Sequence, residues 1–187
     1  MGRPVVLSNG QVFVGLDESG LVHDFYYPYV GLENLTNARS SQHKIGVWVD
    51  DQFSWTDDGS WEISVDLEAE AMISNIRMKS AKLGITIDFL DFIDSEYNAL
   101  VRCMKITNDH DKERDIRLFM HQVSQISRAG RADTALFVPE DTYILDYKGR
   151  CCLLIAGKTT TGETFDQYAV GNYNVEGKAG TFKDAED

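Results

Sequence analysis

The side chains able to do chemistry in this chain are mostly carboxylates, and their spacing selects no pair. There are 30 aspartates and glutamates against 18 lysines and arginines, together with four histidines. Hydrolysis of a glycosidic bond uses two carboxyl groups, but a chain so rich in acids holds many pairs by chance. No GxSxG elbow and no distinct Ser/His/Asp set is present. We therefore predict no catalytic residue within these residues.

The other reactive residue types point to no cofactor and no metal. The four histidines lack metal-ligand spacing, and the three cysteines include no CxxC pair. The aspartates at 50–51 and 57–58 lack a twelve-residue calcium loop and are expected to form turns. The stretch 157–159 reads GKT but has neither the upstream glycine nor the following helix of a phosphate-binding loop. The cysteines are expected to be reduced and buried on strands.

The most informative stretch is an aromatic run, DFYYPYVGLEN, over residues 24–34. The proline ends the predicted strand, and the following glycine permits a tight turn, so the rings are expected at a rigid rim. There they would stack on a sugar or fill an interface with another domain. A cluster that closes the core is the alternative. The candidate rim residues are Tyr26, Tyr27, Pro28, Tyr29, Gly31 and Asn34.

Three tryptophans, Trp48, Trp55 and Trp61, form a second aromatic group. Each lies at the end of a β-forming run or within one. Core positions are favoured for them, because large rings on strands most often fill the space between sheets. A second exposed aromatic surface is the alternative.

Short β-forming runs separated by turn residues must position these groups. Strands are predicted at 11–16, 21–27, 45–49, 52–55, 61–67, 84–94, 98–107, 114–127, 135–138, 142–147 and 151–156. The pair Asn9-Gly10 predicts a type I′ hairpin turn. Residues 68–78 have helix propensity, but the strands around them favour a strand. The pattern predicts an all-β, mostly antiparallel fold in two packed sheets.

Composition limits the classes of partner. An apolar content of 43% is enough for a core. The formal net charge of −12 disfavours nucleic acid and anionic membranes as partners. No apolar stretch has the length of a signal sequence or a membrane span, so a cytoplasmic protein is expected. Residues 159–187 are weakly patterned, as expected where a larger protein has been cut.

Several of these stretches together resemble the start of bacterial and archaeal glucoamylase-type enzymes of glycoside hydrolase family 15. The first third carries the most specific similarity, in residues 7–10, 14–20 and 24–34. The later stretches are 46–50, 53–55, 57–61, 100–102, 107–108, 118–121, 147–150 and 180–187. The resemblance spans almost the whole chain.

The resemblance implies a two-sheet antiparallel supersandwich of the galactose-mutarotase-like type. Residues 1–187 would form the N-terminal domain, truncated at its C-terminal end. In such enzymes an (α/α)6 barrel follows, and two glutamates in it, a general acid and a general base, hydrolyse α-glucosidic bonds with inversion. The implied partners are this barrel, in the same polypeptide, and an α-glucan or gluco-oligosaccharide bound by the parent enzyme.

By this resemblance the domain would support the barrel and shape the rim of its active site. Glucoamylase, glucodextranase, isomaltose-type glucosidase and trehalase-like relatives share such a domain, so the substrate stays open. A carbohydrate-binding β-sandwich module that works alone is the alternative function.

Overall fold

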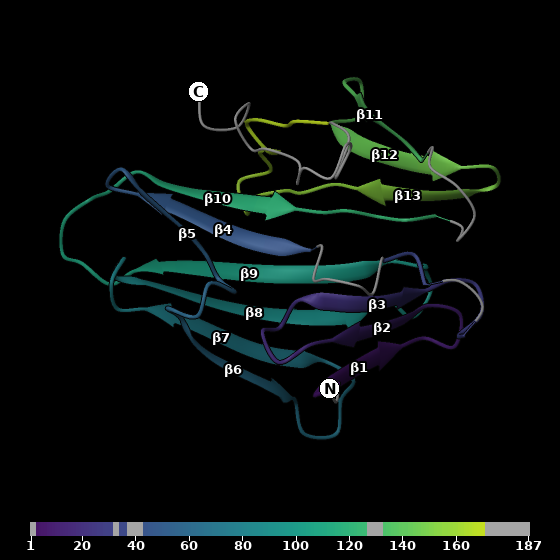
Figure 1. Ribbon diagram of the computed structural model, residues 1–187, viewed down its shortest axis with the longest axis horizontal. Coiled ribbons are helices and arrows are strands. Elements are labelled where there is room, and N and C mark those ends of the chain that lie inside the picture. Colours follow the sequence, from purple (N-terminus) through teal and green to yellow (C-terminus); the bar gives the residue numbers. More distant parts are fainter. Residues whose placement is uncertain (1–2, 32–33, 37–42, 127–132, 171–187) are drawn as a thin grey trace. The chain divides into compact units, whose positions relative to one another are not determined.

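The computed structural model describes residues 3–31, 34–36, 43–126 and 133–170. Within these residues every regular element is a strand, the strands pair antiparallel, and there is no helix (Figure 1). The all-β, antiparallel class predicted from the sequence is thus confirmed. The chain divides into two compact units, of which unit 1 ends at Val123 and unit 2 begins at Ser124. The stretch 180–187, part of the family resemblance, lies outside the described residues.

Three of the four sheets belong to unit 1. The first has the order β1-β2-β3, with β1 Val5–Ser8, β2 Phe13–Leu16 and β3 Val22–Tyr26. The second has the order β10-β4-β5, with β4 Lys44–Val49, β5 Gln52–Trp55 and β10 Ile116–His121. The third has the order β6-β7-β8-β9, with β6 Glu62–Leu67, β7 Ser74–Ser80, β8 Ile85–Ile93 and β9 Leu100–Asn108.

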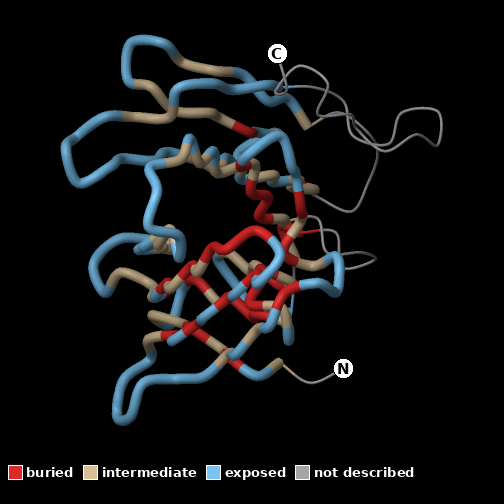
Figure 2. The backbone as a smooth tube through the Cα atoms, turned by 90° about the vertical axis from the view of Figure 1, so that its left-hand side faces the viewer, coloured by how far each residue is buried: buried red, intermediate tan, exposed pale blue. Residues whose placement is uncertain are grey.

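Alternation along the strands builds the core of unit 1. In β8, Ile85, Ile87, Phe89 and Asp91 are buried, and the residues between them are half-buried or exposed. Side chains from β1 to β4, β7 and β8 join one cluster of buried apolar residues. Most of the buried residues, red in Figure 2, belong to this unit. The core is therefore made by packing the inner faces of several sheets together.

The type I′ turn forms at Asp50-Asp51 and not at Asn9-Gly10. Both aspartates have positive φ, 50° and 59°, where they join β4 to β5. Of the other pair only Gly10 has positive φ, and it lies in the longer loop 9–12. The side chain of Asn9 closes that loop, since its Oδ1 accepts a hydrogen bond of 2.9 Å from the amide of Val12. The hairpin predicted at Asn9-Gly10 is therefore present between β1 and β2, but its turn is not of type I′.

Most strand ends differ from the prediction by one or two residues, but two predicted strands are much shorter in the structure. Residues 68–73 form a turn, which the 2.9 Å hydrogen bond from the amide of Glu68 to the carbonyl of Ile73 closes, and β7 begins only at Ser74. The strand predicted over 114–127 ends at His121. β10 has to stop there because it pairs with β4, whose first residue, Lys44, lies opposite His121.

The tryptophans divide between the core and an outer sheet face. Trp61 is 7% exposed and donates a hydrogen bond of 2.9 Å to the hydroxyl oxygen of Ser54. Trp48 and Trp55 are half-buried and lie on the face of β10-β4-β5 opposite the buried Val47. The core position predicted for them is therefore confirmed for Trp61 alone.

A glycine lets the rings of that outer face approach the sheet. Phe53 makes edge-on contacts with Trp55 and Phe119, at centroid distances of 4.8 Å and 5.6 Å. A Cβ atom on Gly46 would lie 2.6 Å from the Phe53 ring, too close for any other residue type without displacing the ring. Arg117 lies 4.4 Å above the ring of Trp48, which gives this face a cation–π contact.

Unit 2 is built on the fourth sheet. Its order is β11-β12-β13, with β11 Thr134–Val138, β12 Tyr143–Lys148 and β13 Cys151–Ile155. Asp133 forms an ion pair of 3.3 Å with Lys148. The ring of Phe137 stacks on Tyr168 at 3.8 Å and meets Phe165 edge-on at 5.8 Å. The segment after β13 thus returns to pack against its own sheet.

Candidate functional site

The predicted rim residues lie together at the end of β3 and in the turn that follows. Tyr26 is the last residue of β3, pairs with Phe13, and contacts its ring edge-on at 5.8 Å. Tyr27 is half-buried and packs against the core cluster. The two rings nearest the strand therefore serve packing, which is the alternative the sequence left open for this run.

The next residues project into solvent. The peptide between Tyr27 and Pro28 is cis. Tyr29 is 65% exposed and Val30 59% exposed. Gly31 has a φ of +86°, in the left-handed region that favours glycine, with open space where a side chain would stand. The turn thus exposes Tyr29, one of the candidate rim residues, and Val30.

The side chain of Asn34 holds the two ends of this turn together. Its Oδ1 accepts hydrogen bonds from the amides of Phe25 (2.9 Å) and Thr36 (3.1 Å) and from the Thr36 hydroxyl (2.8 Å). Its Nδ2 donates to Oδ1 of Asp24 at 2.8 Å. Tyr26 also pairs with Asn34 through an isolated backbone bridge. Asn34 is therefore a positioning residue that holds both ends of the turn.

Asp24 carries the negative charge beneath this turn. It is 9% exposed and forms an ion pair with Arg3, which also lies 2.7 Å from Nδ1 of His23. Burial alone would raise the pKa of Asp24, but the hydrogen bond and charge of Arg3, with the nearby His23, hold that pKa below its usual value. The carboxylate stays ionised at neutral pH and continues to accept from Asn34.

A second loop, the β8–β9 hairpin, joins the turn. Asn9 donates to the carbonyl of Asp94 at 2.9 Å and to that of Tyr97 at 3.3 Å. The amide of Asn98 lies 3.5 Å from the hydroxyl oxygen of Tyr27. Tyr97 is 69% exposed. We call the loops 9–12, 27–31 and 94–99 the tyrosine loops.

The β8–β9 hairpin has its own internal support. The Asp94 carboxylate accepts hydrogen bonds of 2.8 Å from the amides of Tyr97 and Glu96. These bonds lower the pKa of Asp94. A carboxylate that binds its own turn in this way fixes the backbone that carries the exposed tyrosine. The sequence prediction missed Tyr97 and Asn98, although the Asp-Ser-Glu-Tyr-Asn run at 94–98 is a recognisable turn signal.

The tyrosine loops present ring faces, an amide and a short apolar side chain on fixed backbone. Such groups pack against another protein surface or stack on a sugar ring. Among the described residues of these loops none is a cysteine, histidine or lysine. The arrangement suits recognition.

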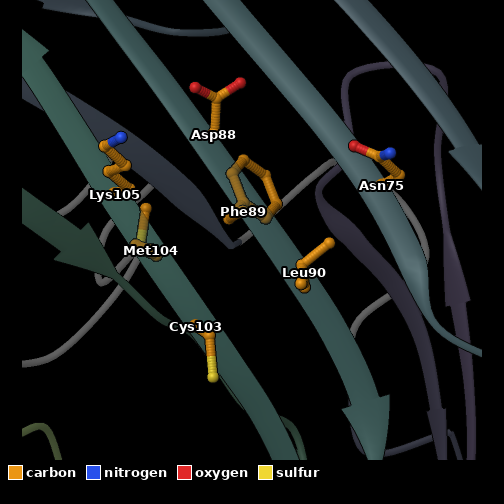
Figure 3. Close-up of a pocket in the computed structure, with 7 residues that line it drawn as sticks. All are labelled: Asn75, Asp88, Phe89, Leu90, Cys103, Met104 and Lys105. Carbon is orange, nitrogen blue, oxygen red and sulfur yellow. The ribbon is translucent and has the colours of Figure 1, made fainter.

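A shallow hollow of about 340 Å³ lies elsewhere in unit 1, on the outer face of β7, β8 and β9 (Figure 3). Its lining residues are Asn75, Asp88, Phe89, Leu90, Cys103, Met104 and Lys105. Cys103 and Cys152 are exposed and Cys151 is half-buried, so the prediction of buried thiols is wrong. Cys103 and Leu90 lie opposite each other on neighbouring strands and point away from the core. That is why the thiol faces solvent.

The comparisons give this chain no family. A search of protein-family models, of curated proteins and of solved structures finds no match to it. In the part of the chain that the structure describes, no group of three or more His, Cys, Asp or Glu residues could hold a metal ion. The same part contains no helix long and apolar enough to span a membrane. The sequence resemblance and the tyrosine loops are the features that bear on its function.

Proposed function

We propose that this chain is the non-catalytic N-terminal β domain of a glucoamylase-like glycoside hydrolase of family 15. In this proposal its sheets belong to a two-sheet supersandwich. Hydrolysis of the α-glucosidic bond, with inversion, takes place in an (α/α)6 barrel of the parent polypeptide that these 187 residues do not include. The antiparallel all-β fold and the sequence resemblance around residues 7–34 support this assignment.

One observation carries the role we assign to the domain. The turn after β3 exposes Tyr29 and Val30 to 65% and 59%, while Asn34 fixes the same turn with four side-chain hydrogen bonds. An exposed apolar pair on an ordered backbone loses little entropy when a partner covers it, so it favours binding. We assign the tyrosine loops as the surface that meets the barrel and shapes the rim of its active site.

The test uses the full-length parent enzyme. We expect Tyr29→Ala together with Val30→Ser to lower kcat/KM on malto-oligosaccharides by about tenfold, because a barrel rim that is less well supported binds the transition state less well. Leu90→Ala, which removes a side chain 41% exposed on a different face, is the control and should leave kcat/KM unchanged. Unchanged kinetics and unchanged thermal unfolding in the double variant would exclude the assignment.

A second function, sugar binding by the chain alone, is favoured by the same exposed rings. Tyr29 and Tyr97 are the most exposed of the large apolar residues described in unit 1. Titration of the isolated chain with maltoheptaose and isomaltotriose, followed by amide NMR shifts, separates the two functions. Shifts confined to the tyrosine loops would favour a binding module, and no shifts would leave the supporting role.

A further inference from the structure

The most exposed large apolar side chains of unit 1 gather at one end of its sheets. Ranked by exposed fraction, the first five among the described residues are Tyr97 (69%), Tyr29 (65%), Val30 (59%), Met72 (53%) and Leu67 (45%). The first three belong to the tyrosine loops. The other two belong to the hairpin of β6 and β7, at the turn 68–73. Exposed apolar side chains that gather in one place mark a surface for a partner.

The strand register places the turn 68–73 beside the β8–β9 hairpin. β7 runs antiparallel to β8, so the start of β7 lies next to the end of β8. There the hydroxyl oxygen of Ser74 accepts a hydrogen bond of 2.7 Å from the amide of Asp91. The turn 68–73 and the hairpin loop 94–99 therefore extend from the same end of the four-stranded sheet (Figure 1). We call the tyrosine loops and the turn 68–73 together the loop end.

Hydrogen bonds order the turn 68–73 before any partner binds. The amide of Glu68 donates to the carbonyl of Ile73 at 2.9 Å. The carboxylate of Glu68 accepts a hydrogen bond of 2.8 Å from the side chain of Asn75 on β7. A surface that is already ordered loses little conformational entropy when it is covered, and this favours binding.

Charge decides which partner fits the loop end. Its described residues include the acidic Glu68, Glu70, Asp94 and Glu96 and no lysine, arginine or histidine. Two copies of such an end repel each other, and nucleic acid and anionic membranes are repelled as well. Net charge does not attract a neutral glucan. A protein surface with lysines and arginines among apolar side chains complements both features of the loop end.

We propose that the whole loop end docks on a partner surface in which lysines and arginines surround apolar side chains. The inference rests on the proposed function, by which this surface is a face of the catalytic barrel in the parent polypeptide. It adds the turn 68–73 to the contact, with Met72 as an apolar group and Glu70 as an acidic group at the edge. Apolar groups at the centre of a contact supply affinity, and charges at its edge select the partner.

The first test compares the unaltered parent enzyme with this chain alone, and it measures the rate at which hydrogen peroxide oxidises each methionine. We expect Met72 to be oxidised about tenfold more slowly in the parent, because the docked partner shields its side chain from solvent. Met120, which is 41% exposed on β10, is the matched control and should react at the same rate in both proteins. Equal rates at Met72 in the two proteins would overturn the proposal.

Charge reversal tests the chemistry of the partner. In the parent enzyme, Glu70→Lys should raise the oxidation rate of Met72 about threefold, because it replaces an attraction at the edge of the contact by a repulsion. Glu113→Lys makes the same change of charge at an exposed residue after β9, at the other end of the same sheet, and should leave the rate unchanged. A Glu70→Lys variant with the original rate would exclude a basic partner and so overturn the proposal.

These outcomes are separate from those that test the proposed function. If Tyr29→Ala with Val30→Ser lowers kcat/KM while Met72 reacts equally in both proteins, the tyrosine loops alone meet the barrel, and this inference is wrong. If Met72 is protected in the parent but the double variant keeps its full kcat/KM, the loop end docks on the barrel, and the role in shaping the rim of the active site is wrong.

Discussion

At the scale of single residues, Asn34 has the largest structural role in the turn that exposes Tyr29. Its amide accepts three hydrogen bonds and donates one to Asp24. The sequence could predict a position near the rim for Asn34, because it follows the glycine of the turn. It could not predict the partners, since these depend on how β3 and residues 34–36 come together in space.

We expect Asn34→Ala to lower the free energy of unfolding by about 2 kcal/mol, because it leaves the backbone amides of Phe25 and Thr36 without this partner and removes one hydrogen bond to Asp24. Urea denaturation measures this change. Asn75→Ala is the control, because the Asn75 side chain is exposed and its one side-chain bond is the 2.8 Å bond to Glu68. The control should change stability by less than about 0.5 kcal/mol. Equal effects of the two substitutions would contradict the role given to Asn34.

His43 makes the stability of unit 1 depend on pH. Burial, with the nearby charges of Arg102 and His121, lowers the pKa of His43 to about 4. The unfolded chain binds a proton at this residue near pH 6.5, so between pH 6.5 and 4 the unfolded state holds more protons than the folded state. Stability from this residue is therefore complete above pH 6.5 and is lost as pH falls towards 4.

We expect the free energy of unfolding to decrease by about 3 kcal/mol over that range, and His43→Gln to remove most of the decrease. Urea denaturation at a series of pH values measures both. His110→Gln, at an exposed position, should leave the slope as it is. A wild-type curve that is flat between pH 6.5 and 4 would show that His43 takes up its proton without cost.

At the scale of elements, two cross-strand ion pairs join the same residue types, an arginine and an aspartate, at different degrees of burial. Burial should therefore set how much each pair contributes to the free energy of unfolding. Asp91 of β8 faces Arg102 of β9 and accepts two hydrogen bonds, of 2.7 Å and 2.6 Å, with side chains 0% and 13% exposed. Arg77 of β7 faces Asp88 of β8 at 2.6 Å, but these side chains are 64% and 36% exposed. Arg102 also donates to the carbonyl of Gly20 at 3.2 Å and so links β9 to the turn before β3.

Because Asp91→Ala leaves the guanidinium of Arg102 buried without its partner, we expect it to lower the free energy of unfolding by about 3 to 5 kcal/mol. The same substitution at Asp88 should cost less than about 1 kcal/mol. Double-mutant cycles on both pairs give the coupling energies directly. Similar coupling energies for the two pairs would mean that burial does not govern them.

The elements also show what local sequence patterns can and cannot predict. The strand at Gln52–Trp55 was predicted to the residue. It follows from a short β-forming run bounded by turn residues. The position of the β8–β9 hairpin beside Tyr27 could not be predicted from local sequence. Asn9 and Asp94 are far apart in sequence, and they meet only because whole sheets pack together. Exposure of Cys103 was missed because a cysteine on a strand gives no sign of which face it takes.

At the scale of the whole molecule, the two units differ in how many apolar side chains they bury. The cluster of buried apolar side chains draws all its members from unit 1, between Val5 and Leu118. In unit 2, Ile126 and Asp146 are buried, while Leu154 and Tyr168 are exposed. Most of the apolar burial that stabilises the chain therefore comes from its first 123 residues.

We expect residues 1–123 expressed alone to fold, because the strands β1 to β10 and the whole core cluster lie within them. The measurement is the cooperativity of thermal unfolding by circular dichroism, with overlay of the amide NMR spectra of the short and the full chains. Peaks from β1 to β9 should coincide in the two spectra, and Arg102→Ala should destabilise both by the same amount. Residues 124–187 expressed alone are the matched comparison and should show no cooperative transition, since their three-stranded sheet leaves Leu136 and Leu154 exposed to water. A short chain without a cooperative transition would mean that the core of unit 1 is insufficient, and that the second unit supplies stability which its exposed side chains do not account for.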